Sequence, residues 1–145
     1  MSSLQFVRVS PRSYIPQSPN YLPRKVRLLH WEFFPMSCFP SGFNPEFLVE
    51  LIMPCSELEK LWDGIKTIRN IKWVNLNASK NLKELPNLST ATNLRELDHI
   101  GCSSLVELPS SIGNAITLWR LDLKFCSNLV ELPPSIGNAI NLKKL

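Results

Sequence analysis

A unit of 24 residues occurs twice in a row near the end of the sequence. The stretch NLRELDHIGCSSLVELPSSIGNAI at residues 93–116 is followed by TLWRLDLKFCSNLVELPPSIGNAI at residues 117–140. A third copy begins with NLKKL at residues 141–145. A fixed period in the twenties means that the chain is built from stacked copies of one small structural unit. This restricts the fold more strongly than any feature of the composition.

The core of each copy, L-x-x-L-x-L-x-x-C, is typical of a leucine-rich repeat. Weaker copies extend towards the N-terminus at spacings of 22–23 residues, so repeats are predicted to begin near residues 4, 26, 48, 71, 94 and 118, with a partial repeat from residue 142. We therefore predict a single leucine-rich repeat domain over residues 1–145, an α/β solenoid of about six repeats.

The opening of each repeat predicts a short strand. Leu121 and Leu123 alternate with period two, as expected of a strand with one buried face. Stacked strands make a curved parallel β-sheet on the concave side, and the chain returns over the convex side in short irregular, 3-10 or helical segments. Pro109 and Pro133 follow the second convex leucine, where a fixed φ and a missing N–H prevent a strand from continuing. Each coil depends on its neighbours to bury its leucines.

Two cysteines occupy the position that follows the strand. Cys102 and Cys126 stand where earlier repeats have Ser56 and Ser79, and a small polar side chain there can bond to backbone groups left open where the coil bends. A disulfide between the two cysteines is within reach. Buried reduced thiols are nevertheless favoured, because no secretory signal precedes them.

Two departures from the pattern concern a histidine and an aromatic cluster. His99 replaces the third core leucine of the repeat and is predicted to lie at the edge of the core, partly satisfied by backbone. If its nitrogens are unpaired, the free energy of unfolding should fall by about 1–3 kcal/mol. Trp31, Phe33 and Phe34 are expected to pack together at an irregular coil.

Side chains between the strand leucines should point to the concave face. Trp73, Trp119 and Phe125 are large apolar groups in positions expected to be open, and aromatic residues beside arginines are typical of protein–protein interfaces. The alternative is that only some are exposed and the rest pack on adjacent strands. The predicted protein-binding residues are Trp73, Asn75, Arg95, Asp98, Trp119, Arg120, Asp122 and Phe125.

Other classes of function find little support in the sequence. The net charge of +4 comes from scattered basic residues, which favours a solvated surface over a nucleic-acid site. No apolar run is long enough to span a bilayer. Phosphate-binding, metalloprotease and hydrolase motifs are missing from the sequence, and Glu84, Glu107 and Glu131 recur as a solvated stripe. We predict no enzyme, no cofactor and no metal site.

Several segments resemble the leucine-rich region of plant TIR-NBS-LRR disease resistance proteins. LLHWEFFP at residues 28–35 and LVELIMPCSELEKLWDGIK at residues 48–66 carry the resemblance most specifically, and it extends from about Leu4 to Leu145. The resemblance implies a cytoplasmic or nuclear immune receptor. Its repeats would recognise a pathogen effector or a guarded host protein, and would contact the receptor's own nucleotide-binding domain to keep the receptor inactive.

The chain also departs from that family. It has no TIR-like region and no phosphate-binding loop, and the sequence stops within a repeat, so we interpret it as a truncated member. The alternative is a generic structural repeat scaffold, or a receptor fragment without autonomous function. An extracellular repeat protein is disfavoured by the missing signal peptide and capping cysteines.

Overall fold

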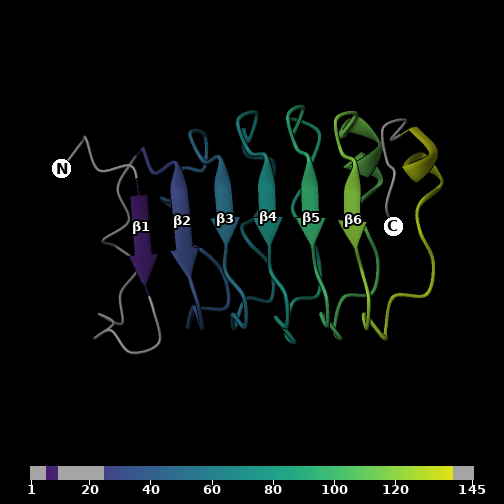
Figure 1. Ribbon diagram of the computed structural model, residues 1–145, viewed down its shortest axis with the longest axis horizontal. Helices are drawn as coiled ribbons and strands as arrows, with labels where there is room; N and C mark the ends of the chain where they lie inside the picture. The colour runs from purple at the N-terminus through teal and green to yellow at the C-terminus, as the bar shows by residue number, and fades with distance from the viewer. Residues whose placement is uncertain (1–5, 10–24, 139–145) are drawn as a thin grey trace.

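In the computed structural model, which describes residues 6–9 and 25–138, the chain forms a solenoid with one parallel sheet. The strands lie side by side in sequence order, with the returning chain on the other side (Figure 1). They are β1 (Phe6–Val9), β2 (Leu28–Trp31), β3 (Glu50–Ile52), β4 (Trp73–Asn75), β5 (Glu96–Asp98) and β6 (Arg120–Asp122). Each begins two residues after a predicted repeat start. The predicted solenoid fold is confirmed, whereas the start at Leu4 and the partial repeat from residue 142 lie outside the described residues.

The core is a column of side chains that each coil repeats. The middle residues of the strands pair in register, as in Leu51 with Val74 and Leu97 with Leu121, and these four side chains are buried. The residue two positions before each strand from β2 to β6 is also buried, and these residues are Val26, Leu48, Ile71, Leu94 and Leu118. One coil therefore covers the apolar side chains of the next, as the repeat pattern predicts.

A carbonyl shared by two N–H groups marks the entry to each strand from β3 to β6. The carbonyl of Lys72 accepts the N–H groups of both Arg95 and Glu96, at 2.9 and 3.1 Å. The carbonyl of Arg95 likewise accepts from Trp119 and Arg120, at 3.0 and 3.3 Å. Two consecutive N–H groups of one coil thus share one carbonyl of the preceding coil, although the strands themselves pair residue for residue. Two consecutive side chains in each coil consequently point away from the core.

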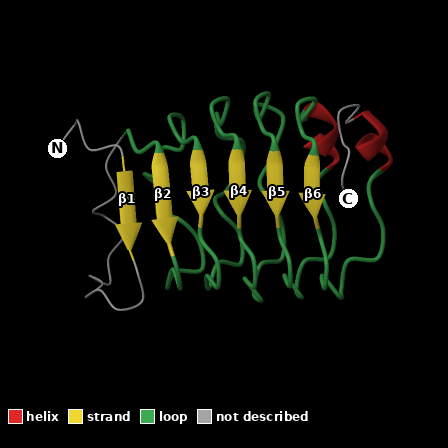
Figure 2. Ribbon diagram, in the orientation of Figure 1, coloured by secondary structure: helices red, strands yellow, loops and turns green. Residues whose placement is uncertain are grey.

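The convex side is mostly irregular, with short helices near the C-terminal end (Figure 2). They are the 3-10 helices η2 (Ser110–Asn114) and η3 (Pro134–Asn138). Pro109 precedes η2 in an extended conformation, with φ −67° and ψ 146°. The predicted mixture of irregular and 3-10 segments is confirmed.

Serine and cysteine side chains hold the coils together behind the sheet. Ser56 Oγ lies 2.8 Å from Ser79 Oγ, which also accepts the Ser56 N–H at 3.2 Å. Cys102 Sγ donates to the carbonyl of the Leu76 residue at 3.2 Å, and Cys126 Sγ donates to the carbonyl of His99 at 2.9 Å. Both cysteines are buried and free, so the prediction of reduced thiols bonded to the backbone is confirmed.

A left-handed residue follows every strand from β2 to β6, a feature that the sequence analysis did not predict. The residues are Phe33, Cys55, Ala78, Gly101 and Phe125, with φ between 58° and 76°. The N–H groups of the first four continue the hydrogen bonding between coils, as in Ala78 to the Ile100 carbonyl at 2.7 Å. Only one of these five residues is a glycine, so each of the others costs about 1–2 kcal/mol of backbone strain.

His99 corrects the prediction of a core-edge histidine partly satisfied by backbone. Its side chain is fully buried, and neither ring nitrogen has a hydrogen-bond partner. Burial lowers the pKa of His99 to about 4, because the low-dielectric interior disfavours the imidazolium form. The ring lines a cavity of about 10 Å³ whose wall also includes Trp62 and Leu76.

The aromatic cluster is confirmed in part. Trp31 and Phe34 are buried and meet edge to face, with ring centroids 4.9 Å apart. Phe39 and Phe43 extend the cluster by stacking at 4.5 Å. The prediction for Phe33 is wrong, because its side chain is 53% exposed. It occupies the left-handed position after β2, which turns its side chain away from the core.

Candidate protein-binding face

Outward side chains form three rows across the sheet face that the returning chain leaves uncovered, here called the open face. The first row precedes the strands by one residue and consists of Arg27, Val49, Lys72, Arg95 and Trp119. The second row holds the first residue of each strand, and the third row holds the third residue. Seven of the eight predicted site residues lie in these rows, and Phe125 does not.

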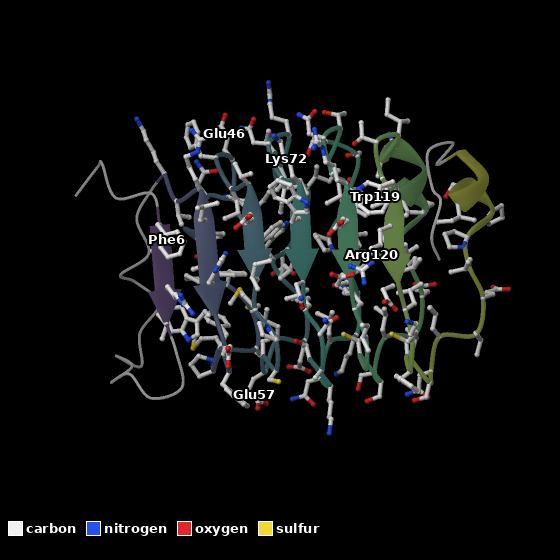
Figure 3. All side chains as sticks on the ribbon, viewed as in Figure 1. Phe6, Glu46, Glu57, Lys72, Trp119 and Arg120 are labelled. Atoms are coloured by element: carbon white, nitrogen blue, oxygen red, sulfur yellow. The ribbon has the colours of Figure 1, made fainter. Side chains whose placement is uncertain are left out.

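The first row contains the predicted residues Arg95 and Trp119. They are neighbours, because the Trp119 N–H donates to the Arg95 carbonyl at 3.0 Å. Both side chains are exposed, Trp119 to 41%. Figure 3 shows Lys72 and Trp119 near the N-terminal ends of β4 and β6. An arginine and a tryptophan held side by side on a rigid sheet have the chemistry of an interface anchor.

Trp73 lies in the second row and is only half-buried. The Lys72 ammonium is placed 5.9 Å from the centre of its ring, at a distance that favours a cation–π contact. Trp73 is thus less exposed than Trp119, and the contact described for its ring is with the preceding residue of its own coil and not with an adjacent strand.

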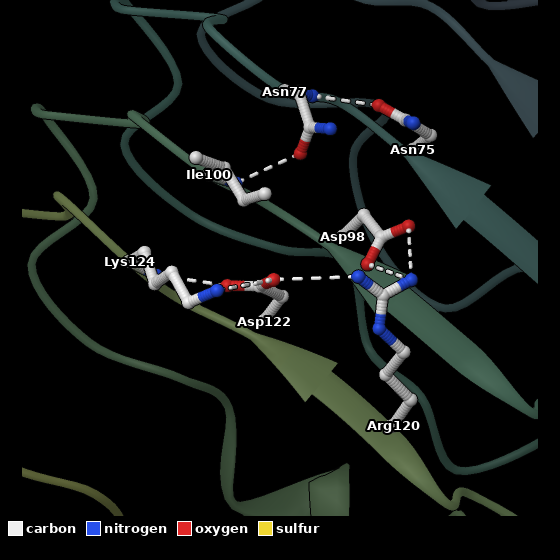
Figure 4. Close-up of polar contacts among 7 residues, drawn as sticks. All are labelled: Asn75, Asn77, Asp98, Ile100, Arg120, Asp122 and Lys124. Carbon is white, nitrogen blue, oxygen red and sulfur yellow. Dashed lines mark hydrogen bonds and ion pairs between the residues drawn. The ribbon is translucent and has the colours of Figure 1, made fainter. Parts of the chain in front are cut away.

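Arg120 joins two carboxylates across β5 and β6 (Figure 4). Its Nη1 lies 3.2 Å from Asp98 Oδ1, and its Nη2 lies 3.4 Å from Asp122 Oδ2. Burial raises the pKa of Asp98, while the Arg120 guanidinium opposes the rise and Asp122 adds to it. The three side chains form one fixed network. The sequence pattern predicts that they share a face but does not predict the ion pairs between them. This network pre-organises the polar part of the open face.

Two predicted site residues also shape the turn after their strand. Asn75 Oδ1 accepts the N–H of Asn77 at 3.0 Å, and Asp122 Oδ1 accepts the N–H of Lys124 at 3.2 Å. Asp122 is only 5% exposed, so it is less available to a partner than the sequence analysis predicted. Both residues have a local structural role in the turns (Figure 4).

Phe125 lies apart from the three rows, in the turn after β6. It is 80% exposed and adopts φ 61°. The preceding coil has Gly101 at this position, with φ 76°. A bulky, exposed residue in a strained conformation is unfavourable for the isolated chain, and such strain is often found where a protein contacts a ligand.

At the other end of the face, His30 Nε2 lies 3.0 Å from Glu50 Oε2, and the rings of Phe6 and His30 are 5.3 Å apart. These residues belong to the second and third rows but were not among the predicted site residues. Within the described ranges, no group of three His, Cys, Asp or Glu side chains is arranged to hold a metal ion.

Comparisons with known proteins agree with the repeat architecture. Residues 47–66 match the family Leucine Rich Repeat. The leucine-rich repeat domain of the type III effector XopL superposes with a TM-score of 0.69, at 23% identity, over 84% of this chain and 42% of that chain. This likeness defines the class: the chain is a leucine-rich repeat solenoid.

Sequence relatives are found among plant disease resistance proteins. Disease resistance protein TAO1 of Arabidopsis thaliana is 63% identical over 101 residues, which is 70% of this chain and 8% of the relative. Disease resistance protein RPP5 of the same plant is 53% identical over 120 residues, 81% of this chain and again 8% of the relative. The chain matches the plant TIR-NBS-LRR disease resistance proteins in their leucine-rich repeat region.

The chain thus spans about a twelfth of the length of these relatives. In the described part of the chain, no helix has the length and apolar character needed to cross a bilayer. The repeat fold in general serves as a scaffold for protein interaction.

Proposed function

We propose that this chain is the protein-binding repeat module of an intracellular plant immune receptor, acting in the cytoplasm or nucleus. It would recognise a pathogen effector or a guarded host protein, and contact with the receptor's own nucleotide-binding domain would regulate the receptor. The observation that carries the proposal is Trp119, which stays 41% exposed beside Arg95 on a sheet whose core side chains are buried.

The physical argument rests on how interfaces gain energy. A tryptophan can bury a large apolar area on binding while losing little conformational freedom, because it has only two side-chain torsions. Arg120 is already fixed by Asp98 and Asp122, so less entropy is lost when a partner contacts this network. The open face therefore combines an exposed anchor with a pre-organised polar network, which favours binding over catalysis.

The proposal is tested by capturing partners from plant extract with the full chain and its variants. Trp73→Ala, Trp119→Ala and Phe125→Ala should each reduce recovery of the partner. The matched controls are Val106→Ala and Val130→Ala, which truncate side chains that are 51% and 87% exposed and lie outside the three rows and the left-handed positions. Circular dichroism of each variant checks that the fold is retained. Unchanged recovery with all three aromatic variants would refute the proposal.

The alternative is a structural repeat scaffold or a fragment without autonomous function. Circular dichroism and sedimentation of the purified chain separate it from the leading proposal. A folded monomer with a cooperative unfolding transition supports an autonomous module, and a disordered or aggregated product supports the alternative.

A further inference from the structure

The first row of the open face carries three cations that have no carboxylate partner among the described residues. They are Arg27, Lys72 and Arg95, here called the basic row. The row follows one continuous ladder, in which Lys72 N–H donates to the Val49 carbonyl at 2.9 Å and Arg95 N–H to the Lys72 carbonyl at 2.9 Å. Since adjacent strands lie about 4.8 Å apart, Lys72 and Arg95 are like charges on neighbouring positions.

Several other cations among the described residues, unlike these three, have carboxylate partners. Lys60 contacts Asp63, Lys83 Nζ lies 2.9 Å from Glu59, and Arg120 joins Asp98 and Asp122. The carboxylate of Glu50 lies in the second row but contacts His30 instead. Like charges on adjacent strands destabilise a sheet, so the basic row has an electrostatic cost that no ion pair with a described carboxylate offsets.

Trp119 ends this row and is exposed next to Arg95. From the unpaired charges and this apolar end, we infer that the basic row binds an acidic segment of a partner protein, with Trp119 packing against its apolar residues. The inference rests on the proposed function and adds the chemical class of the partner. A bound carboxylate would relieve the repulsion between Lys72 and Arg95, and charge complementarity of this kind accelerates association.

A protein segment fits this face better than a nucleic acid. Asp98 and Asp122 lie in the third row of the same face. They would repel a broad polyanion such as a nucleic-acid backbone, whereas a narrow acidic segment can follow the first row alone. Their charges are partly balanced by Arg120, which leaves the basic row as the positive edge of the face.

The test measures binding of the full chain to four labelled probes by fluorescence polarisation. Three are synthetic peptides of equal length and apolar content, one acidic, one neutral and one basic, and the fourth is a single-stranded RNA. The acidic peptide should bind most tightly, and its affinity should fall as salt is raised, because salt screens exposed charges. Arg95→Glu should weaken its binding by about three- to tenfold.

The control is Lys80→Glu, which changes the net charge equally at an exposed lysine outside the three rows. It should leave affinity for the acidic peptide unchanged. Equal binding of the neutral peptide, preference for RNA, or equal losses with Arg95→Glu and Lys80→Glu would overturn the inference. If Trp119→Ala still weakens binding of every peptide, the proposed function stands without the inference about the basic row. If no peptide binds, or if Trp119→Ala leaves the affinity unchanged, the inference is overturned, and the proposed function is judged separately by partner capture with all three aromatic variants.

Discussion

Replacing His99 with leucine should stabilise the protein. The imidazole is fully buried, and both ring nitrogens lack a partner. Leu76 occupies the equivalent position one coil earlier and is fully buried, so the register accommodates a leucine. The substitution changes volume little, and the cavity of about 10 Å³ beside the ring gives the new side chain room to adjust.

The expected gain is about 1–3 kcal/mol, the cost of burying a polar group without a hydrogen bond. For a chain of this size that corresponds to a rise in melting temperature of roughly 3–10 °C. Urea titration at neutral pH, followed by circular dichroism, measures the gain directly. The reciprocal variant Leu76→His should lose stability by a similar amount, because it places an imidazole at the same position of the neighbouring coil.

The pH dependence of the free energy of unfolding gives a second test of the burial of His99. Because the pKa of His99 is about 4 in the folded protein and about 6.5 in the unfolded chain, the unfolded state takes up the proton first as pH falls. The free energy of unfolding therefore keeps its full value above about pH 6.5. It decreases as the pH falls towards 4, by about 3 kcal/mol in all.

His99→Asn separates the cost of burying an unpaired polar group from the loss of stability at low pH. Asparagine keeps a buried polar group but does not titrate, so it should remove this pH-dependent loss without the gain expected from leucine. Unchanged or lower stability of His99→Leu at neutral pH would show that the ring is hydrogen-bonded in solution, and would refute the reasoning.

Further predictions concern the turns and the thiols. Gly101→Ala should cost about 1–2 kcal/mol in urea titration, because alanine is strained at φ 76° although its Cβ would have ordinary contacts. Phe125→Gly should raise stability by up to about 1 kcal/mol but reduce partner capture, which thermal melts and pull-down measure together. Ser79→Ala should cost about 1–3 kcal/mol in chemical denaturation, because the buried Ser56 N–H loses its acceptor. Cys102 should resist alkylation until the chain unfolds, as mass spectrometry can follow, because burial raises the pKa of its thiol to about 12.

The sequence predicts the strands and the three rows of the open face well, because the positions of both follow from the period of the repeat. Once the repeat is aligned, each position inherits the role of its equivalents, and Trp119 and Arg95 fall on the open face without further information. Cys102 is bonded to backbone like Ser79 at the equivalent position, although Ser79 accepts an N–H and Cys102 donates to a carbonyl. That the domain covers residues 1–145 stays a prediction, since three segments lie outside the described residues.

The remaining features depend on geometry that the alignment does not contain. Only Gly101 marks the left-handed position in the sequence, and this single glycine does not show that Phe33 turns away from Trp31 and Phe34. The missing partners of His99 depend on what surrounds the ring in three dimensions. The Arg120 network depends on side-chain reach between strands, although the alignment of Asp98 with Asp122 in the third row could have indicated it.

The central claim is that binding takes place on the open face, and hydroxyl-radical footprinting of the full chain with and without its captured partner tests it most directly. Aromatic side chains oxidise readily where they are exposed, so Trp119 reports on the open face and Phe125 on the turn after β6, while Val106 and Val130 report on exposed positions elsewhere in the coils. The account predicts that the partner protects Trp119 and Phe125 and leaves both valines unchanged. Protection of the valines alone would contradict it.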